Sequence, residues 1–208
     1  MPQPYTLSVQ KVAKRFNKTK LFNDIDFQLI SGDKLAITGT NGSGKSTLLK
    51  IIAGIIPPSK GKVNVLANDK EVSKEAYFKH FNICAPYIEL IEEFSLREHL
   101  AFHQNFKEPL FEDGIEEIVK EAGLLPHLDQ KLNSFSSGMK QRVKLILAIC
   151  YNSTVMMLDE PTSHLDEAGK NWYKKLLNTY SNERICILFS NETEEYIFFT
   201  KKMVNIEP

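Results

Sequence analysis

The stretch of sequence that decides the fold is Gly39-Thr40-Asn41-Gly42-Ser43-Gly44-Lys45-Ser46. It matches the pattern G-x-x-x-x-G-K-[ST] at every fixed position. Glycines let the backbone curl so that successive N–H groups point inward, where they bind phosphate oxygens. A glycine-rich turn without a ligand is the alternative, but an apolar run precedes this stretch and a helical pattern follows it. The sequence therefore predicts a phosphate loop, with Lys45 reaching the β- and γ-phosphates and the Ser46 hydroxyl binding Mg²⁺.

The chain around this loop has the pattern of an α/β protein. Polar and apolar residues alternate over 6–10 and 24–29, which predicts strands with one covered face. A short apolar strand over 34–38 leads into the loop, and a helix is expected over 45–54. Another short strand is predicted over 62–66.

The middle of the chain, from about 87 to 152, has mainly helical patterns. The spacing of Ser95 and Glu98 predicts a capping box at the start of one helix. A second helix is expected over 115–122, and Ser136 or Ser137 is expected to cap a longer one. This stretch is interpreted as a helical subdomain inserted between strands.

Strands return after the helical stretch. Continuous apolar runs over 155–158 and 185–189 predict buried parallel strands, with a helix over 171–180 between them. A last strand is expected over 203–206. The predicted fold class is α/β, with a mixed sheet of antiparallel N-terminal strands plus a parallel core, and an inserted α-helical subdomain. The predicted organisation is one domain over 1–208, with a nucleotide-binding core over 1–86 and 153–208 and the helical subdomain over 87–152.

An acidic pair, Asp159 and Glu160, ends the buried strand over 155–158. A phosphate loop needs a carboxylate to hold Mg²⁺, and hydrolysis needs a group that positions water. Asp159 is the expected Mg²⁺ ligand, directly or through water, and Glu160 the expected group that orients the attacking water. A surface acidic pair is the alternative. The loop and this pair together fit any P-loop NTPase.

Composition and charge narrow the function classes. The chain has 208 residues, 26 Lys and Arg against 26 Asp and Glu, and 42% hydrophobic residues. A balanced charge gives no support for a nucleic-acid binder or a polybasic membrane anchor. No run approaches the roughly 20 apolar residues of a membrane span, and the N-terminus lacks the features of a signal peptide. Cys84, Cys150 and Cys186 lie in apolar company, which is typical of buried free thiols in a reducing compartment. A cytoplasmic protein is expected.

Further motifs, between and after the phosphate loop and the acidic pair, resemble those of ABC ATPases. The run Phe135-Ser136-Ser137-Gly138-Met139-Lys140-Gln141-Arg142 is similar to the signature of that family, usually L-S-G-G-Q followed by two residues and Arg. Its first serine lies 23 residues before Asp159, the usual separation in the family. The run from Glu160 to Asp166 resembles the Walker B exit and D-loop. Phe16 stands where the family places an aromatic residue that stacks on adenine.

The resemblance implies a mechanism. In this family two cassettes dimerise head to tail around two ATP molecules, and each ATP contacts one subunit's phosphate loop and the other's signature helix. Ser137 and Gly138 are then expected to present a hydroxyl and a backbone N–H to the partner's γ-phosphate. The nucleotide-contacting residues implied are Phe16, Gly39, Thr40, Asn41, Gly42, Ser43, Gly44, Lys45, Ser46, Thr47, Tyr87, Ser137, Gly138 and Asp166. The catalytic residues implied are Glu160, Lys45 and Asn191, and the metal ligands are Ser46 and Asp159.

Two departures from the family pattern bear on activity. Tyr87 stands where the family has the glutamine of the Q-loop, and a phenol cannot reproduce the contact of an amide carbonyl to Mg²⁺ and water. Tyr87 either couples the helical subdomain to a membrane partner or is a packing tyrosine. Asn191 replaces the usual switch histidine, and an amide donates a hydrogen bond to γ-phosphate but carries no positive charge. Slow hydrolysis is therefore expected. The changes in the signature, Phe135, Ser137 and Met139, are expected to be tolerated.

The leading hypothesis is an ATP-binding and ATP-hydrolysing subunit that drives a separate membrane permease. The alternative is a degenerate, low-activity cassette that acts as a regulatory clamp or as the weak half of a heterodimer. A soluble ABC ATPase acting on ribosomes or DNA is disfavoured, because Lys45 and Asp159 are 114 residues apart with no sustained heptads, and the charge is neutral. The cofactors implied are ATP and Mg²⁺. The partners implied are a second ABC cassette, in a homodimer or heterodimer, and a membrane-spanning permease, with no nucleic acid. The chain is then expected in the cytoplasm, peripheral on the inner face of the membrane.

Overall fold

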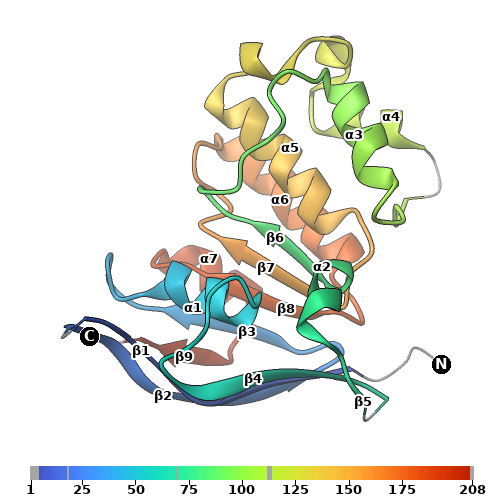
Figure 1. Ribbon diagram of the computed structural model, residues 1–208. Coiled ribbons are helices and arrows are strands. Elements are labelled where there is room, and N and C mark those ends of the chain that lie inside the picture. The colour runs from blue at the N-terminus through green and yellow to red at the C-terminus, as the bar shows by residue number, and fades with distance from the viewer. Residues whose placement is uncertain (1–4, 18, 69, 112–113, 207–208) are drawn as a thin grey trace. The chain divides into compact units, whose positions relative to one another are not determined.

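The structure is a computed structural model that describes residues 5–17, 19–68, 70–111 and 114–206 (Figure 1). It contains two compact units. The first unit comprises Met1–Phe81, Thr154–Asp159 and Glu183–Pro208, and the second comprises Asn82–Ser153 and Glu160–Asn182. The division into a nucleotide-binding core and a helical subdomain at residues 86 and 153 stays a prediction.

An antiparallel sheet begins the first unit. Its strand order is β2-β1-β4-β5, with bounds Tyr5–Phe16 for β1, Thr19–Ile30 for β2, Lys60–Ala67 for β4 and Lys70–Glu71 for β5. Strands β1 and β2 are longer than the alternating pattern predicts. The register between them shifts after Val9, and Lys11 has φ 46°, so a bulge interrupts the alternation without ending the strand.

A parallel sheet forms the core of the first unit. Its strands run in the order β7-β8-β3-β9, and every pair among them is parallel. The bounds are Lys34–Thr38 for β3, Val155–Asp159 for β7, Ile185–Phe189 for β8 and Met203–Asn205 for β9. Every residue of β7 and β8 is buried, as continuous apolar runs predict for parallel strands. The α/β fold class with antiparallel and parallel strands is confirmed. The chain leaves the first unit within β6 (Phe81–Cys84).

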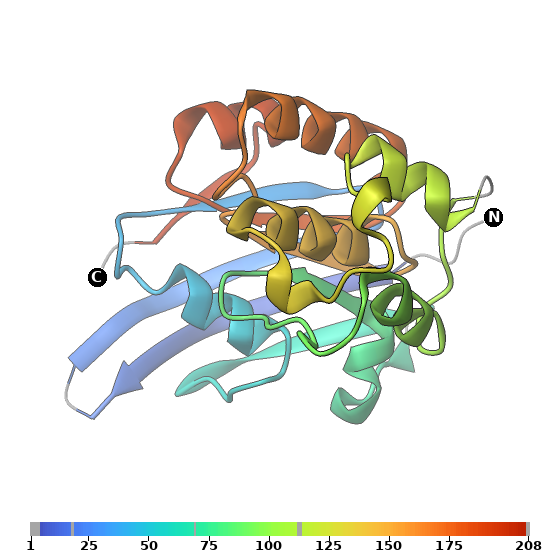
Figure 2. The same ribbon diagram turned by 90° about the horizontal axis from the view of Figure 1, so that it is seen from above.

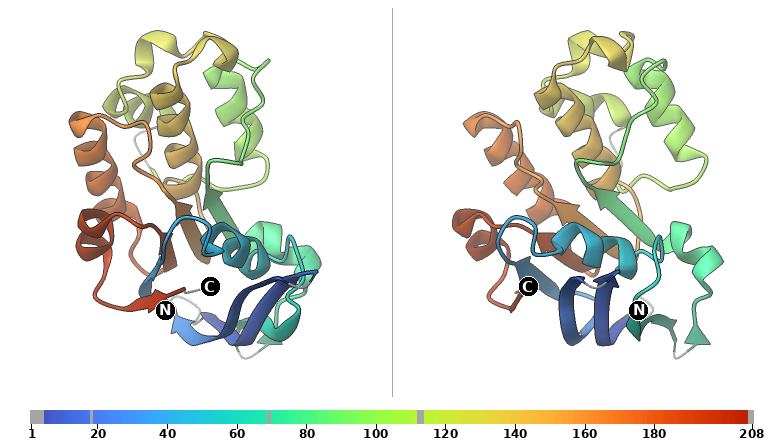
Figure 3. Two further views of the ribbon diagram at one scale, coloured as in Figure 1. Left: turned by 90° about the vertical axis from the view of Figure 1, so that its left-hand side faces the viewer. Right: turned by 60° about the vertical axis from the view of Figure 1, so that its left-hand side comes forward.

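Helix α1 (Lys45–Ile52) lies between the antiparallel strands and the parallel strands (Figures 1 and 3). It contacts β7 and β8. Its apolar side chains Leu48, Leu49, Ile51 and Ile52 are all buried. The helix ends near the predicted point, where Gly54 takes φ 73° and its N–H donates to the carbonyl of Ile51. Short elements that the sequence pattern did not predict complete the unit: a 3₁₀ turn over Lys74–Ala76, α2 (Tyr77–His80) and α7 (Thr193–Phe199).

The second unit is mainly helical. Its helices are α3 (Leu96–Gln104), α4 (Ile115–Glu121), α5 (Ser137–Ile149) and α6 (Glu167–Tyr180), with 3₁₀ turns at Leu125–His127 and Leu132–Ser134. Helices α5 and α6 run side by side (Figure 2). The predicted capping box of Ser95 and Glu98 is present at α3, and Ser136 caps α5. Helix α6 begins four residues before the predicted start, because Asp166 caps it.

All three cysteines are buried. Among the described ranges, no helix has both the length and the apolar character that a membrane crossing requires.

Two histidines lie one turn apart on α3 and are withdrawn from water. His99 is 7% exposed, and its Nδ1 has no hydrogen-bond partner among the described residues. Its Nε2 accepts from the backbone N–H of Ile91 at 3.3 Å. The ring of His103 lies edge-on to Tyr151, with the two ring centroids 4.6 Å apart. Burial, together with the charges of His99 and Lys107, lowers the pKa of His103 to about 4, and burial also lowers the pKa of His99. Both imidazoles are therefore neutral in the folded chain at pH 7.

We predict that the free energy of unfolding falls as the pH falls from 6.5 towards 4. The unfolded chain takes up a proton near pH 6.5, whereas folded His103 takes it up only near pH 4. Between pH 7 and pH 5 the folding constant is expected to drop about twentyfold through this group. Urea titrations of the wild type and His103→Gln measure the effect, with His127→Gln, a change at a half-buried histidine outside α3, as the control. The same pH dependence in all three proteins would show that His103 does not cause it.

Candidate functional site

The phosphate loop connects the end of β3 to the start of α1 in the first unit. Gly39 has φ 150°, and a Cβ atom there would lie 2.5 Å from the carbonyl oxygen of Ile206 and 2.6 Å from Ser43 Oγ. Gly44 has φ 105°, and a Cβ atom there would lie 2.8 Å from the side chains of Leu21 and Phe22. The loop therefore curls too tightly for side chains at these two positions. The glycine spacing of the motif follows from this close packing.

The inside of the loop is suited to an anion. The buried Lys45 side chain folds over it, and Nζ donates to the carbonyl oxygens of Gly39 at 2.8 Å and Thr40 at 3.1 Å. Helix α1 has no side-chain cap and no acidic residue in its first turn, so its N-terminal N–H groups remain available. Ser43 Oγ is buried without a hydrogen-bond partner among the described residues. These are the features of a cradle for phosphate oxygens, and Thr47 follows in the first turn of α1.

The two predicted metal ligands lie together. Ser46 Oγ donates to Asp159 Oδ2 at 2.7 Å, although the residues are 113 positions apart. Asp159 is the last residue of β7 and is 2% exposed. A hydroxyl and a carboxylate oxygen are hard ligands, and Mg²⁺ commonly takes one or two protein oxygens and completes its shell with phosphate oxygens and water. The pair therefore fits Mg²⁺ bound with a nucleotide. Within the described part of the chain no group of three or more His, Cys, Asp and Glu forms an all-protein metal site.

Glu160 follows Asp159 with φ 47°, in the left-handed region. A residue with a side chain pays roughly 1–2 kcal/mol for this conformation. The chain thus turns sharply after β7. On a continuing strand the side chains of Asp159 and Glu160 would point to opposite faces of the sheet, and the turn removes this alternation. Residues in such conformations cluster at functional sites.

Asn191 lies just after β8, and its side chain contacts the phosphate loop. Its Nδ2 donates to Asn41 Oδ1 at 3.1 Å, across 150 residues of sequence. The predicted catalytic amide is therefore next to the predicted loop. No sequence pattern predicts the contact with Asn41, because this contact depends on β8 and β3 being neighbours.

Phe16 ends β1 with its ring 53% exposed. The Nζ atom of Lys14 lies 5.1 Å from the centroid of this ring. Phe16 belongs to the β1–β2 hairpin. The same hairpin carries Leu21 and Phe22, whose side chains pack against Gly44 and leave no room for a Cβ atom there. An exposed aromatic ring on a strand pair that packs against the phosphate loop is available for stacking.

The signature residues lie at the N-terminus of α5 in the second unit. Ser136 Oγ accepts from the backbone N–H of Met139 at 3.3 Å, which leaves Ser137 and Gly138 in the first turn. A Cβ atom on Gly138 would lie 2.8 Å from the carbonyl oxygen of His164. The D-loop therefore packs directly on the signature glycine.

Two further side chains of α5 hold the D-loop. Gln141 Nε2 donates to the carbonyl oxygen of Pro161 at 2.8 Å, and Arg142 Nη2 donates to Asp166 Oδ1 at 2.9 Å. Arg142 Nη1 also donates to the carbonyl oxygen of Ala122 at 2.8 Å. The backbone N–H of Gly169 and the Arg142 guanidinium keep the pKa of Asp166 below its usual value. Sequence reasoning assigned no role to Gln141, because a contact with a backbone carbonyl leaves no motif.

Tyr87 is half-buried in the second unit. The carbonyl oxygens of the two preceding residues, Ala85 and Pro86, accept from Lys144 Nζ at 3.4 and 3.3 Å. The segment before Tyr87 is thus attached to α5. Its two interpretations, coupling to a membrane partner and simple packing, both stay predictions.

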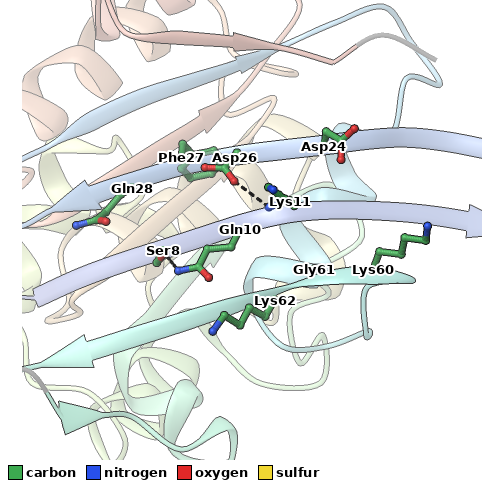
Figure 4. Close-up of a pocket in the computed structure, with 10 residues that line it drawn as sticks. All are labelled: Ser8, Gln10, Lys11, Asp24, Asp26, Phe27, Gln28, Lys60, Gly61 and Lys62. Atoms are coloured by element: carbon green, nitrogen blue, oxygen red, sulfur yellow. Dashed lines mark hydrogen bonds between the residues drawn. The ribbon is translucent and has the colours of Figure 1, made fainter.

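The predicted site residues thus fall into two groups. The first unit holds Phe16, the loop residues 39–47, Asp159 and Asn191, and the second holds Tyr87, Ser137, Gly138, Glu160 and Asp166. An open hollow of about 760 Å³ on β1, β2 and β4 is lined by other residues, including Gln10, Asp26 and Lys62 (Figure 4). Lys11 and Asp26 meet there through a hydrogen bond of 3.0 Å between the Lys11 N–H and Asp26 Oδ2. That hollow contains none of the predicted site residues.

A phosphate loop between a parallel strand and a helix, with a carboxylate at the end of another parallel strand, defines a P-loop NTPase. The family model described as "ABC transporter" matches residues 22–163. The "Probable iron export ATP-binding protein FetA" of Escherichia coli (strain K12) is 31% identical over 206 residues, covering 97% of this chain and 91% of its own length. The chain belongs to the ABC transporter family, as an ATP-binding subunit, and the resemblance seen in its motifs is confirmed.

Other relatives match over different shares of their length. The "ATP-binding cassette sub-family A member 7" of Rattus norvegicus is 28% identical over 194 residues, or 91% of this chain. The chain spans only 9% of the length of that relative. A solved structure titled "Structure of ATP binding subunit of ABC transporter" superposes with a TM-score of 0.85 at 24% identity, over 97% of this chain and 85% of the other. This structural likeness shows the fold.

Proposed function

We propose that this chain binds Mg²⁺–ATP in the phosphate loop and hydrolyses it to drive a separate membrane-spanning permease. The observation that carries the proposal is the hydrogen bond between Ser46 and Asp159, which brings the Mg²⁺ ligands of two distant motifs to one place beside the loop. ATP binding and ATPase activity are general in the family to which the chain belongs.

Each residue of the first group has a role in this proposal. Lys45 and the loop N–H groups bind the β- and γ-phosphates, while Ser46 and Asp159 hold Mg²⁺. When bound, Mg²⁺ neutralises charge on the phosphate oxygens. Glu160 orients the attacking water and accepts its proton as the bond from the water oxygen to the γ-phosphorus forms and the bond from that phosphorus to the leaving oxygen of ADP breaks. Phe16 stacks on adenine, and its exposed ring supports this assignment.

A second cassette completes the site in this proposal. Ser137 and Gly138 occupy the first turn of α5, a 13-residue helix, where backbone N–H groups and the helix dipole favour an anion. They contact the γ-phosphate held by the partner's loop. The attachment of the D-loop to α5 supports a joint movement of Asp166 with these residues. The partner is a second copy of this chain or a different cassette.

A row of exposed aromatic rings in the second unit supports a membrane partner. Phe102 and Phe106 are 41% and 56% exposed, and their ring centroids are 5.2 Å apart. Phe94 meets Phe102 edge-on at 5.8 Å. Exposed apolar groups gathered in one place mark interaction surfaces. We propose that this row contacts the permease, which holds the chain at the cytoplasmic face of the membrane.

The second candidate is a low-activity cassette that clamps or regulates, alone or as the weak half of a heterodimer. Tyr87 and Asn191, in place of the family's glutamine and histidine, favour it. A neutral amide at position 191 stabilises developing charge on the γ-phosphate less than a cation does. Intact Lys45, Asp159 and Glu160 favour the hydrolysing subunit.

We predict that Glu160→Gln lowers steady-state ATP hydrolysis at least a hundredfold while ATP still binds. The amide keeps the size of the side chain but cannot accept the proton of water. Phosphate release by the assembled complex, compared with binding of a fluorescent ATP analogue, measures the two effects separately. Equal rates for wild type and Glu160→Gln would contradict hydrolysis at this site and favour the clamp.

We also predict that the chain co-purifies with a multi-spanning membrane protein when it is tagged in its native cell and membranes are solubilised gently. With the double variant Phe102→Ser/Phe106→Ser, the amount of that membrane protein recovered is expected to fall at least tenfold relative to the wild type, because the apolar contact surface is removed. Phe78→Ser, which changes a ring that is 58% exposed in the first unit, is the matched control. Recovery of the wild type with soluble proteins only would contradict the transporter role.

A further inference from the structure

The segment after β8 is attached to β3 through its backbone and to the phosphate loop through a side chain. The backbone N–H of Ser190 donates to the carbonyl oxygen of Ile37 at 3.2 Å, and Ser190 is 1% exposed. Its hydroxyl accepts from the N–H of Glu192 at 3.0 Å, which fixes the turn. The side chains then meet where Asn191 Nδ2 donates to Asn41 Oδ1. The backbone of Ser190 therefore anchors this segment to β3, and the side chain of Asn191 contacts the phosphate loop.

The contact between the two amides sets which end of Asn191 faces the loop. An asparagine side chain carries an acceptor oxygen on one side and two N–H donors on the other. Rotation about its last bond exchanges the two, and only the N–H side attracts an anion. The Asn41 oxygen takes one of the two N–H groups and leaves the second free to donate. A free Asn191 would lose this orientation.

We propose that Asn41 is a positioning residue that holds the amide of Asn191 with an N–H group toward the terminal phosphate of the nucleotide, so that the pair distinguishes ATP from ADP without carrying charge. This inference rests on the proposed function, because it places ATP in the loop. It assigns to Asn41 a task beyond its place in the glycine-rich motif.

The effect on stability is expected to be small. Both side chains are exposed, so a hydrogen bond between these neutral groups competes with water and adds little to the stability of the fold. A hydrogen bond from an amide to a charged phosphate is stronger than one between neutral groups. Removal of the contact between Asn41 and Asn191 is therefore expected to change the preference for ATP over ADP rather than the stability of the fold. Neither amide titrates between pH 5 and 8, so the pair adds no pH dependence of its own to the discrimination.

A double-mutant cycle on nucleotide affinity tests the proposal. Dissociation constants for ADP and for a non-hydrolysable ATP analogue, both with Mg²⁺, are measured for the wild type, Asn41→Ala, Asn191→Ala and the double variant. Asn171→Ala, an exposed asparagine on α6, is the matched control. Each single variant is expected to lower the preference for the ATP analogue over ADP about five- to tenfold, and the double variant is expected to lower it no further.

The possible outcomes distinguish failure of the role proposed for Asn41 from failure of the proposed function. Independent, multiplicative losses in the double variant, or an equal loss of affinity for both nucleotides, would overturn the role of Asn41. An unchanged preference in Asn41→Ala would do the same. A wild-type chain that binds neither nucleotide would overturn the proposed function, and the inference with it. Urea titration of each variant shows that it is folded, so that lost affinity is not lost structure.

Discussion

The hydrogen bond from Ser46 to Asp159 depends on the strand order of the parallel sheet, and the rest of the candidate site depends on the same order. Strands β7, β8 and β3 are neighbours and run in one direction. The chain leaves their carboxyl ends at Asp159, at Asn191 and at the phosphate loop. Ligands of α/β proteins bind at such ends. Two segments from distant parts of the sequence therefore reach the loop and its helix, one with the carboxylate of Asp159 and one with the amide of Asn191.

The second unit has its own internal constraint. Along α5, Gly138 lies against the D-loop backbone, while Gln141 and Arg142 donate to it. These three positions lie on one face of the helix because they are spaced by three and four residues. These contacts attach the D-loop to the helix that bears the signature residues. Under the proposed function, a movement of the signature residues on binding the partner's γ-phosphate would therefore also move the D-loop.

Most of the fold and the phosphate loop were predictable, because glycine spacing, helix caps and buried apolar runs are local signals. The limits of β1 were not, since the bulge at Lys11 breaks the alternation on which the prediction relies. The start of α6 was missed because Asp166 caps it and the apolar pattern begins later. The contact of Asn41 with Asn191 was out of reach for a different reason: it requires the order of strands that are 150 residues apart. The roles predicted for the site residues stay predictions until they are measured.

In the proposed function, Ser46 and Asp159 hold Mg²⁺ beside a nucleotide in the phosphate loop. Calorimetric titration with ATP, in the presence and absence of Mg²⁺, measures this role when wild type and Ser46→Ala are compared. We expect Mg²⁺ to strengthen ATP binding at least tenfold in the wild type. In Ser46→Ala this enhancement should largely disappear, while Mg²⁺-free binding persists through Lys45 and the loop N–H groups. An equal enhancement by Mg²⁺ in both proteins, or no binding of ATP to the wild type, would contradict it.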